Sequence, residues 1–250
     1  MRLSLAFAAA NQCTTYLAQR GLEVSLSQDP LEVAASVAAV GKPYLTPWLD
    51  PLSNDFGERN FFWVIGRSKD GVEMVGGGRI DDLGERPSGL IKRLFDRTYG
   101  VGTVTGVSER CDDALQGRVC YLGDLYSRST RGLGRERVRA FVGVAHAFAA
   151  MSFSVDATYS FMRNADILRG SADVNGFTRR VLDPVTWGQM PEARSETEQI
   201  VYRHRSDDAV YFNGLIRELG RSEVAQRHCR IDPQREAPSE DSSPELEVDA

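Results

Sequence analysis

One stretch of the sequence combines residues that bind anions with a pattern that places them at the start of a helix. It runs from Tyr121 to Glu136, reads YLGDLYSRSTRGLGRE, and changes from a strand-like half to a helical pattern. The first N–H groups of a helix lack internal partners, the helix dipole adds positive charge there, and glycines let a phosphate approach closely. The residues that would contribute here are Arg128, Arg131, Gly132, Gly134 and Arg135. The stretch therefore predicts phosphate binding.

Two familiar nucleotide-binding motifs do not fit this stretch. A Walker P-loop would end in GK[ST], which is absent here. A GxGxxG dinucleotide motif would need glycine at position 137, where Arg137 stands. A glycine-containing turn with solvated arginines is the alternative without a ligand, and the local pattern leaves it open.

The same stretch resembles the pyrophosphate loop of the GNAT superfamily of acyl-CoA-dependent N-acyltransferases. That loop reads [Q/R]-x-x-G-x-[G/A], commonly R-G-x-G-x-G. Residues 131–136, RGLGRE, match the arginine and both leading glycines and depart at Glu136, which replaces Gly or Ala. The order of expected elements extends the resemblance over roughly residues 20–215, although it is specific only at 120–162. The resemblance implies that acetyl-CoA or another acyl-CoA is a co-substrate.

The resemblance also places the cofactor on named residues. In the family, the exposed backbone of the central strand binds the pantetheine arm, which would fall on Leu125, Tyr126 and Ser127. The pyrophosphate would be held by the N–H groups of Arg131, Gly132, Leu133, Gly134, Arg135 and Glu136. The reaction is direct attack of an amine on the thioester, which needs a base, an acid for the leaving thiolate, and backbone donors at the carbonyl.

The catalytic candidates lie beside that loop. Asp124 is the candidate base, because a carboxylate among apolar residues is costly to bury without a partner or a function. Tyr159 is the candidate acid, by a loose match to a tyrosine that the family often uses beyond the long helix, and Tyr126 is the alternative. A hydrogen-bonded structural Asp and a core tyrosine are the competing interpretations. The acceptor would be a small-molecule or protein amine, with specificity expected from residues 41–60 and 76–78.

These residues require an α/β fold to position them. We expect a GNAT-like mixed, mostly antiparallel sheet flanked by helices, in which one parallel strand pair splays around the cofactor. Helices are expected at 3–20, 31–40, 89–99 with Ser88 as cap, 135–153 and 166–181. Strands are expected at 22–27, 61–66 and 72–80 (a hairpin turning at 68–71), 118–127, 155–162, 197–204 and 209–213.

Composition bounds the remaining possibilities. The chain has 250 residues, 42% apolar and 26% charged, which is ordinary for a globular protein. We expect one acyltransferase-like domain over 1–230, with the helix 3–20 appended, and a disordered acidic tail over 231–250. That tail carries a charge of −6 and leaves +1 for the rest, so no nucleic-acid partner is expected. No run of about 18 apolar residues occurs, so we expect no membrane span and a cytoplasmic protein.

Two other functions stay open. An acyl-homoserine-lactone-synthase-like enzyme would carry Glu and Arg together in the central strand, where residues 121–124 read YLGD. A non-catalytic module that binds a ligand or a partner is the second alternative, because Glu136 departs from the loop motif. The four cysteines show no metal-ligand spacing, so no metal site is predicted. A homodimer is possible.

Overall fold

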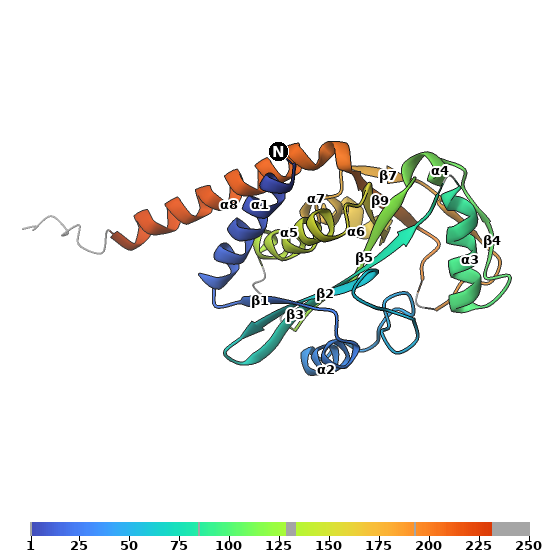
Figure 1. Ribbon diagram of the computed structural model, residues 1–250, viewed down its shortest axis with the longest axis horizontal. Coiled ribbons are helices and arrows are strands. Elements are labelled where there is room, and N and C mark those ends of the chain that lie inside the picture. The colour runs from blue at the N-terminus through green and yellow to red at the C-terminus, as the bar shows by residue number, and fades with distance from the viewer. Residues whose placement is uncertain (1, 85, 129–133, 193, 232–250) are drawn as a thin grey trace, which may run out of the picture.

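A mixed sheet with helices on both faces forms the centre of the computed structural model, which describes residues 2–84, 86–128, 134–192 and 194–231 (Figure 1). The helices are α1 (Arg2–Ala18), α2 (Pro30–Val40), α3 (Pro87–Tyr99), α4 (Arg110–Ala114), α5 (Arg135–Ser152), α6 (Asn164–Leu168), α7 (Ser171–Val174), the 3-10 turn η1 (Arg205–Asp207) and α8 (Asp208–Ile231). The strands are β1 (Glu23–Ser27), β2 (Phe61–Ser68), β3 (Gly71–Asp82), β4 (Val104–Val107), β5 (Arg118–Ser127), β6 (Ala157–Arg163), β7 (Arg179–Val181), β8 (Val185–Trp187) and β9 (Glu198–His204).

The strand order brings the central strand β5 beside β6. In the described part of the chain the main sheet has the order β1-β2-β3-β5-β6-β9-β7, and β4 pairs with β8 in a separate ribbon. Every neighbouring pair of the main sheet is antiparallel except β5 and β6. The β5–β6 pairing runs from Val119 to Tyr121 on β5 and stops there, so the two strands part over the rest of their length. The predicted mixed sheet with a splayed parallel pair is confirmed.

The glycine run in β3 is required by two aromatic rings on β2. Phe62 pairs with Gly78 and Trp63 pairs with Gly77 across the hairpin. A Cβ atom at Gly78 would lie 2.3 Å from the Phe62 ring, and one at Gly77 would lie 2.7 Å from the Trp63 ring. The close backbone approach that such a run indicates in a strand is therefore present. The turn forms as predicted, with Gly71 at φ +109°.

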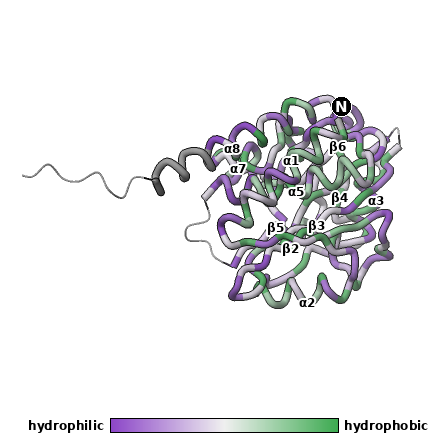
Figure 2. The backbone as a smooth tube through the Cα atoms, turned by 60° about the vertical axis from the view of Figure 1, so that its left-hand side comes forward, coloured by the Kyte–Doolittle hydropathy of each residue, from purple (hydrophilic) through white to green (hydrophobic). Residues whose placement is uncertain are grey.

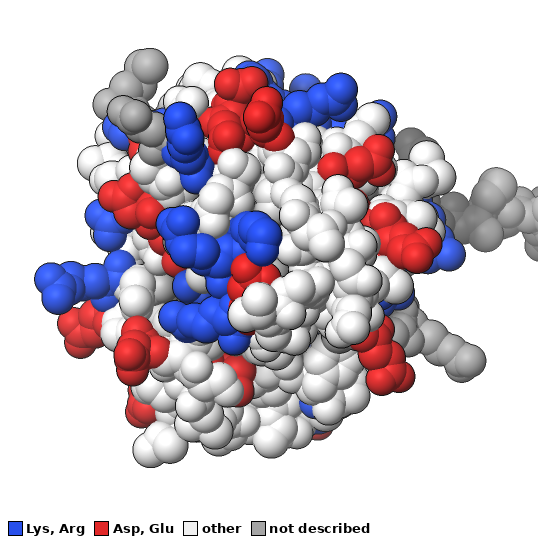
Figure 3. Space-filling model, turned by 90° about the vertical axis from the view of Figure 1, so that its right-hand side faces the viewer, with Lys and Arg blue, Asp and Glu red and all other residues white. Residues whose placement is uncertain are grey.

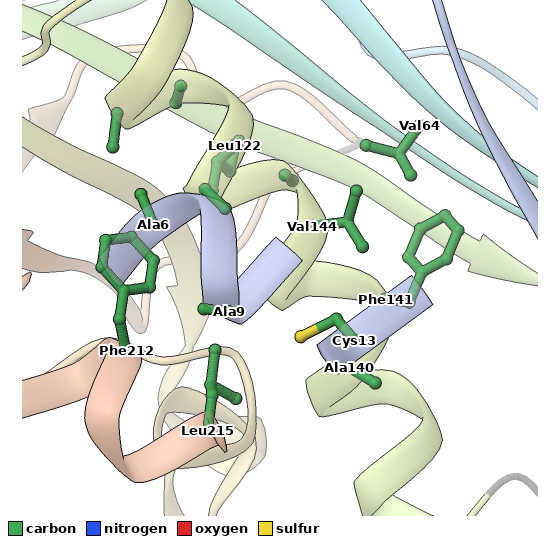
Figure 4. Packing of buried hydrophobic residues seen from close by; sticks show 14 of the residues in the cluster. Ala6, Ala9, Cys13, Val64, Leu122, Ala140, Phe141, Val144, Phe212 and Leu215 are labelled. Atoms are coloured by element: carbon green, nitrogen blue, oxygen red, sulfur yellow. The ribbon is translucent and has the colours of Figure 1, made fainter. Parts of the chain in front are cut away.

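Helices α1, α5 and α8 cover one face of the sheet and share a core with it. Figure 2 shows α1 and α5 on the opposite side of β2, β3 and β5 from α2. Figure 4 shows the small side chains of α1 and α5 packing closely, with larger side chains of α8 and the sheet around them. The labelled members are Ala6, Ala9, Cys13, Val64, Leu122, Ala140, Phe141, Val144, Phe212 and Leu215.

A second core lies on the opposite face, under α2, α3 and α4. Helix α2 begins as its sequence predicts, because the Asp29 side chain accepts a hydrogen bond from the Leu31 N–H and Pro30 occupies the first turn. This core is strongly aromatic, with Trp48, Phe61, Trp63, Phe95, Tyr121 and Tyr159 all buried. Side chains alternate along a strand, so Tyr121 enters this core whereas Leu122 enters the other.

Three predicted elements differ from the structure. Residues 209–213 belong to helix α8 rather than a strand, because Phe212, Leu215 and Leu219 recur at helical spacing and are buried. Residues 166–181 form the end of α6, α7 and β7 rather than one helix. Ser88 does not cap α3. Its hydroxyl and N–H instead donate to the Asp112 carboxylate of α4.

Two sequence predictions fall on residues outside the described ranges. These are the loop residues Arg131, Gly132 and Leu133 and the acidic tail beyond Ile231.

Each helix in the described ranges is too short or too polar to cross a membrane. On the face that is turned to the right in Figure 1, basic side chains form a group with acidic side chains around and between them (Figure 3).

Candidate functional site

A cavity of about 450 Å³ opens where β5 and β6 part. Residues 121–125 of β5 and 160–163 of β6 form its two edges, and helix α5 forms a wall. Phe141 and Val142 of α5 make that wall apolar. On the other side of the sheet the lining carries charged groups, which are Asp124, Arg194 and Glu198. The cavity therefore joins a space beside the apolar wall of α5 to a charged end beside the second core.

A β-bulge shapes the β5 edge of the cavity. The register of β3 against β5 shifts between Val75 and Gly77. Two residues of β5, Asp124 and Leu125, oppose the single Gly76, which is the pattern of a bulge. Asp124 has φ +54°, a left-handed conformation that Asp adopts more readily than most residues. The bulge leaves both residues outside the ladder and lining the cavity.

The Asp124 carboxylate is fully engaged by the segment after α2. Lys42 Nζ lies 2.8 Å from Oδ1, and the Asp124 and Lys42 side chains are only 1% and 8% exposed. The Thr46 hydroxyl donates to Oδ2 at 2.7 Å, and the Thr46 N–H donates to the same oxygen at 3.1 Å. An incoming ammonium would have to displace one of these donors to reach the carboxylate. These contacts of Asp124 with Lys42 and Thr46 hold β5 against residues 42–46, and we call them the clamp.

The predicted cofactor residues of β5 fall at and beyond the bulge. Leu125 lines the cavity and is 38% exposed, so its side chain leaves room beside it. Tyr126 pairs with Val75 of β3 and packs against the second core rather than lining the cavity. Ser127 pairs with Met74 at the end of the strand.

The first turn of α5 lies at the predicted pyrophosphate loop. Gly134 is the N-cap residue, and a Cβ atom there would meet no atom within 4 Å. The Arg135 guanidinium donates to the Arg169 carbonyl at 2.6 Å. Glu136 accepts a hydrogen bond from the Tyr16 hydroxyl of α1 at 2.8 Å. Its carboxylate is thus tied to α1, and burial together with this bond raises the pKa of Tyr16 to about 12.

The predicted acid Tyr159 lies apart from the cavity. Its side chain is fully buried in the second core, and its ring contacts those of Tyr121 and Phe161. Among the described residues its hydroxyl has no hydrogen-bond partner, and burial raises its pKa strongly. Tyr121 does line the cavity, and burial raises its pKa as well. Tyr121 therefore keeps its proton while it faces the space that a substrate would enter.

The sequence pattern did not single out Arg194 and Glu198, which lie at the far end of the cavity. Arg194 Nη1 donates to Glu198 Oε2 at 3.2 Å, and the two side chains are 5% and 8% exposed. Burial raises the pKa of Glu198, although Arg194 partly offsets this effect. Burial by itself lowers the pKa of Arg194, but neighbouring tyrosines and Glu198 outweigh it and raise the value overall. Their spacing of four residues in a polar segment carried no signal by itself.

The described residues contain no group of three or more His, Cys, Asp or Glu side chains placed to hold a metal ion. What the cavity offers is a buried carboxylate, a buried guanidinium and a tyrosine hydroxyl around an open space. A carboxylate can take a proton from an ammonium group, and a neutral tyrosine can give one to a thiolate.

Comparison with known proteins yields structural likenesses only. No family model and no curated protein matches the chain. An aminoglycoside N(6′)-acetyltransferase from Legionella pneumophila is 14% identical, with a TM-score of 0.39 over 74% of this chain and 94% of that one. A ribosomal-protein-S5-alanine acetyltransferase from Vibrio fischeri is 8% identical, with a TM-score of 0.43 over 75% and 94%. A CoA-dependent acyl-homoserine lactone synthase with SAM and isopentyl-CoA is 11% identical, with a TM-score of 0.37 over 76% and 81%.

The described part of the chain has the mixed, mostly antiparallel sheet with a splayed parallel pair that the sequence predicted. Its strand order, the parting of β5 and β6, and the long helix after the central strand agree with the predicted layout. At these identities and TM-scores the likenesses say nothing about the reaction or the substrate of this protein. Those must be inferred from the chemistry of the cavity.

Proposed function

We propose that the protein is an acyl-CoA-dependent N-acyltransferase that moves an acyl group, most simply acetyl, to an amine. The observation that carries the proposal is the cavity where β5 and β6 part, with a buried carboxylate at its charged end. The thioester would enter on the α5 side and the amine on the side of the second core. The two reactants would then meet at the level of the sheet.

The cofactor would lie along β5 and the start of α5. The strand residues Leu125, Tyr126 and Ser127 would offer backbone groups to the pantetheine arm. The loop residues Arg131, Gly132, Leu133, Gly134, Arg135 and Glu136 would hold the pyrophosphate at the helix N-terminus. Two observations support this placement: a Cβ atom at Gly134 would meet no atom within 4 Å, and the Glu136 carboxylate is held by the Tyr16 hydroxyl of α1.

The reaction would be a direct transfer. The ammonium first gives one proton to the base, and the amine nitrogen then attacks the thioester carbonyl carbon. The carbon–sulfur bond breaks, the nitrogen loses a second proton as the amide forms, and the CoA thiolate takes up one proton. We place Glu198 ahead of Asp124 as the base, because the Asp124 oxygens already hold Lys42 and Thr46. Tyr121 is better placed than Tyr126 or Tyr159 to protonate the thiolate, because it lines the cavity.

Calorimetry with acetyl-CoA, octanoyl-CoA and free CoA tests the cofactor half of the proposal. Micromolar binding of acetyl-CoA, about −8 kcal/mol, is the expected result, followed by CoA release in an amine screen. Preference for octanoyl-CoA would favour a signal-synthase-like enzyme. If none of the three binds, the acyltransferase proposal falls and a non-catalytic module takes its place.

The Glu198→Gln variant tests the assignment of the base. We expect it to bind acetyl-CoA as the wild type does and to lose about 100-fold or more in turnover, the range that general bases contribute. Asp113→Asn is the matched control, since that residue lies outside the main cavity. A fully active Glu198→Gln variant would remove Glu198 from the mechanism.

A further inference from the structure

The Arg194–Glu198 ion pair has an unsatisfied donor inside the molecule. Arg194 Nε donates to the Tyr99 hydroxyl at 3.1 Å, and Nη1 donates to Glu198. Nη2 is buried and has no hydrogen-bond partner among the described residues. Buried hydrogen-bond donors nearly always have a partner, because a donor without one loses its hydrogen bonds to water on folding and gains none in return. Arg194 is also one of the residues that line the cavity.

Aromatic rings hold the guanidinium in place. The ring centroids of Trp48, Phe95, Tyr99 and Phe161 lie 5.1–5.5 Å from the Arg194 guanidinium carbon. Contacts of this kind stabilise a cation on the ring faces. The planar group is thus fixed before any ligand arrives, which lowers the entropy that binding must overcome. Arg194 is therefore held in a fixed position beside the cavity as the partner of Glu198.

The other charges around the cavity are already matched or lie at its rim. Asp124 is paired with Lys42, and Asp166 is paired with Arg169. Arg163 is exposed at the end of β6, where its backbone pairs with that of Glu198. The buried charged end of the cavity therefore presents one positive and one negative group side by side.

We infer that the acceptor is an amine that carries a carboxylate on the adjacent carbon, an α-amino acid or a compound with that head group. Its carboxylate would accept from Arg194 Nη2, and its ammonium would lie against Glu198, which takes the proton. A plain amine would leave Nη2 without an acceptor, whereas a zwitterion matches both members of the pair. This inference rests on the proposed acyltransferase function and narrows its substrate class.

Matched acceptors test the inference with acetyl-CoA as donor. We would compare L-phenylalanine with phenylethylamine, L-lysine with cadaverine, and L-alanine with ethylamine, with the corresponding amino-acid amides as a third arm. We expect kcat/KM to be about 10- to 100-fold higher for at least one amino acid than for its amine and its amide, as a charge-assisted hydrogen bond implies. This comparison uses the wild-type protein and does not depend on how a variant folds.

The Arg194→Lys variant assigns that preference to a residue. A lysine keeps the charge but lacks the planar fork of N–H donors with which Arg194 reaches Tyr99 and Glu198 from separate atoms. We expect the ratio of kcat/KM for the amino acid to kcat/KM for its amine to fall to about one, whatever the change in the absolute rates, because Arg194 also contacts the proposed base Glu198. Arg67→Lys, at an exposed pair with Glu32 away from the cavity, is the matched control and should keep the preference.

The outcomes separate the two proposals. If amines are acetylated at least as well as their amino acids, the inference is wrong and the acyltransferase function stands. The same holds if the preference survives in Arg194→Lys. If acetyl-CoA does not bind, or no amine of any class is acetylated, the acyltransferase function itself fails and this inference falls with it.

Discussion

Asp124→Asn breaks the buried ion pair with Lys42 while it leaves most of the local geometry intact. An asparagine carbonyl can still accept from the Thr46 hydroxyl and N–H, and asparagine tolerates the left-handed φ of +54°. The substitution therefore leaves a lysine that is 8% exposed with no counter-charge. Breaking a buried pair costs about 3–5 kcal/mol, and the partial access of Lys42 to water favours the lower end.

Urea unfolding at constant m value measures that loss. We expect Asp124→Asn to lower the free energy of unfolding by about 3 kcal/mol, which corresponds to a fall in Tm of roughly 6–12 °C for a chain of this size. Adding Lys42→Met removes the unpaired ammonium, so the double variant should recover much of the stability. Lys42→Met alone should be as damaging as Asp124→Asn, because it leaves the carboxylate unpaired.

Turnover in the same three variants separates a clamp from a base. If Asp124 only clamps β5 to residues 42–46, activity should fall with stability and recover in the double variant. If Asp124 takes the proton, turnover should fall by about 100-fold or more and stay low in the double variant. A loss of less than about 1 kcal/mol in Asp124→Asn, together with lost turnover, would refute the clamp and restore Asp124 as the base.

Three further predictions test the cofactor site, the hairpin and the charged end of the cavity. Gly134→Glu should abolish acetyl-CoA binding without changing Tm, because the N-cap has open space but the added carboxylate repels a pyrophosphate; unchanged affinity would contradict the loop assignment. Gly78→Ala should lower the free energy of unfolding by about 3 kcal/mol, because the new Cβ would lie 2.3 Å from the Phe62 ring. Gly214→Ala in α8, where a Cβ would meet nothing within 4 Å, should instead raise the free energy of unfolding by up to about 1 kcal/mol. Burial raises the pKa of Glu198 above its usual 4.5, so the folded state binds the proton more tightly than the unfolded state does. The contribution of Glu198 to the free energy of unfolding should therefore fall as the pH rises from 4.5 through the raised pKa. Over the same pH interval kcat/KM should rise, because Glu198 loses its proton and can act as a base. A kcat/KM that does not rise with pH in this interval would exclude Glu198 as the base.

Local sequence signals determined the elements whose side chains alternate or recur clearly. The turn at 68–71 predicted the β2–β3 hairpin, and the strand predicted at 118–127 is β5. The apolar pattern after residue 135 predicted α5. Each of these predictions used only the periodicity or the turn residues of a single segment, so it needed no knowledge of contacts with distant residues.

Short or polar segments were decided by their tertiary surroundings. A run such as residues 209–213 suits a strand or a helix, and its packing against α1 and α5 selects the helix. Residues 166–181 lack a continuous apolar face. They divide into short helices and β7, which pairs with β9.

The candidate site divides in the same way. The sequence alone predicted the strand that ends at residue 127 and the long helix that begins at residue 135, and it marked Asp124 as a carboxylate that needs a partner. Only the tertiary structure supplied that partner, because Lys42 is distant in the chain. It also brought Arg194 and Glu198 to the gap between β5 and β6. Such charges have no local periodicity, and their energy depends on burial and on partners that only the folded chain provides.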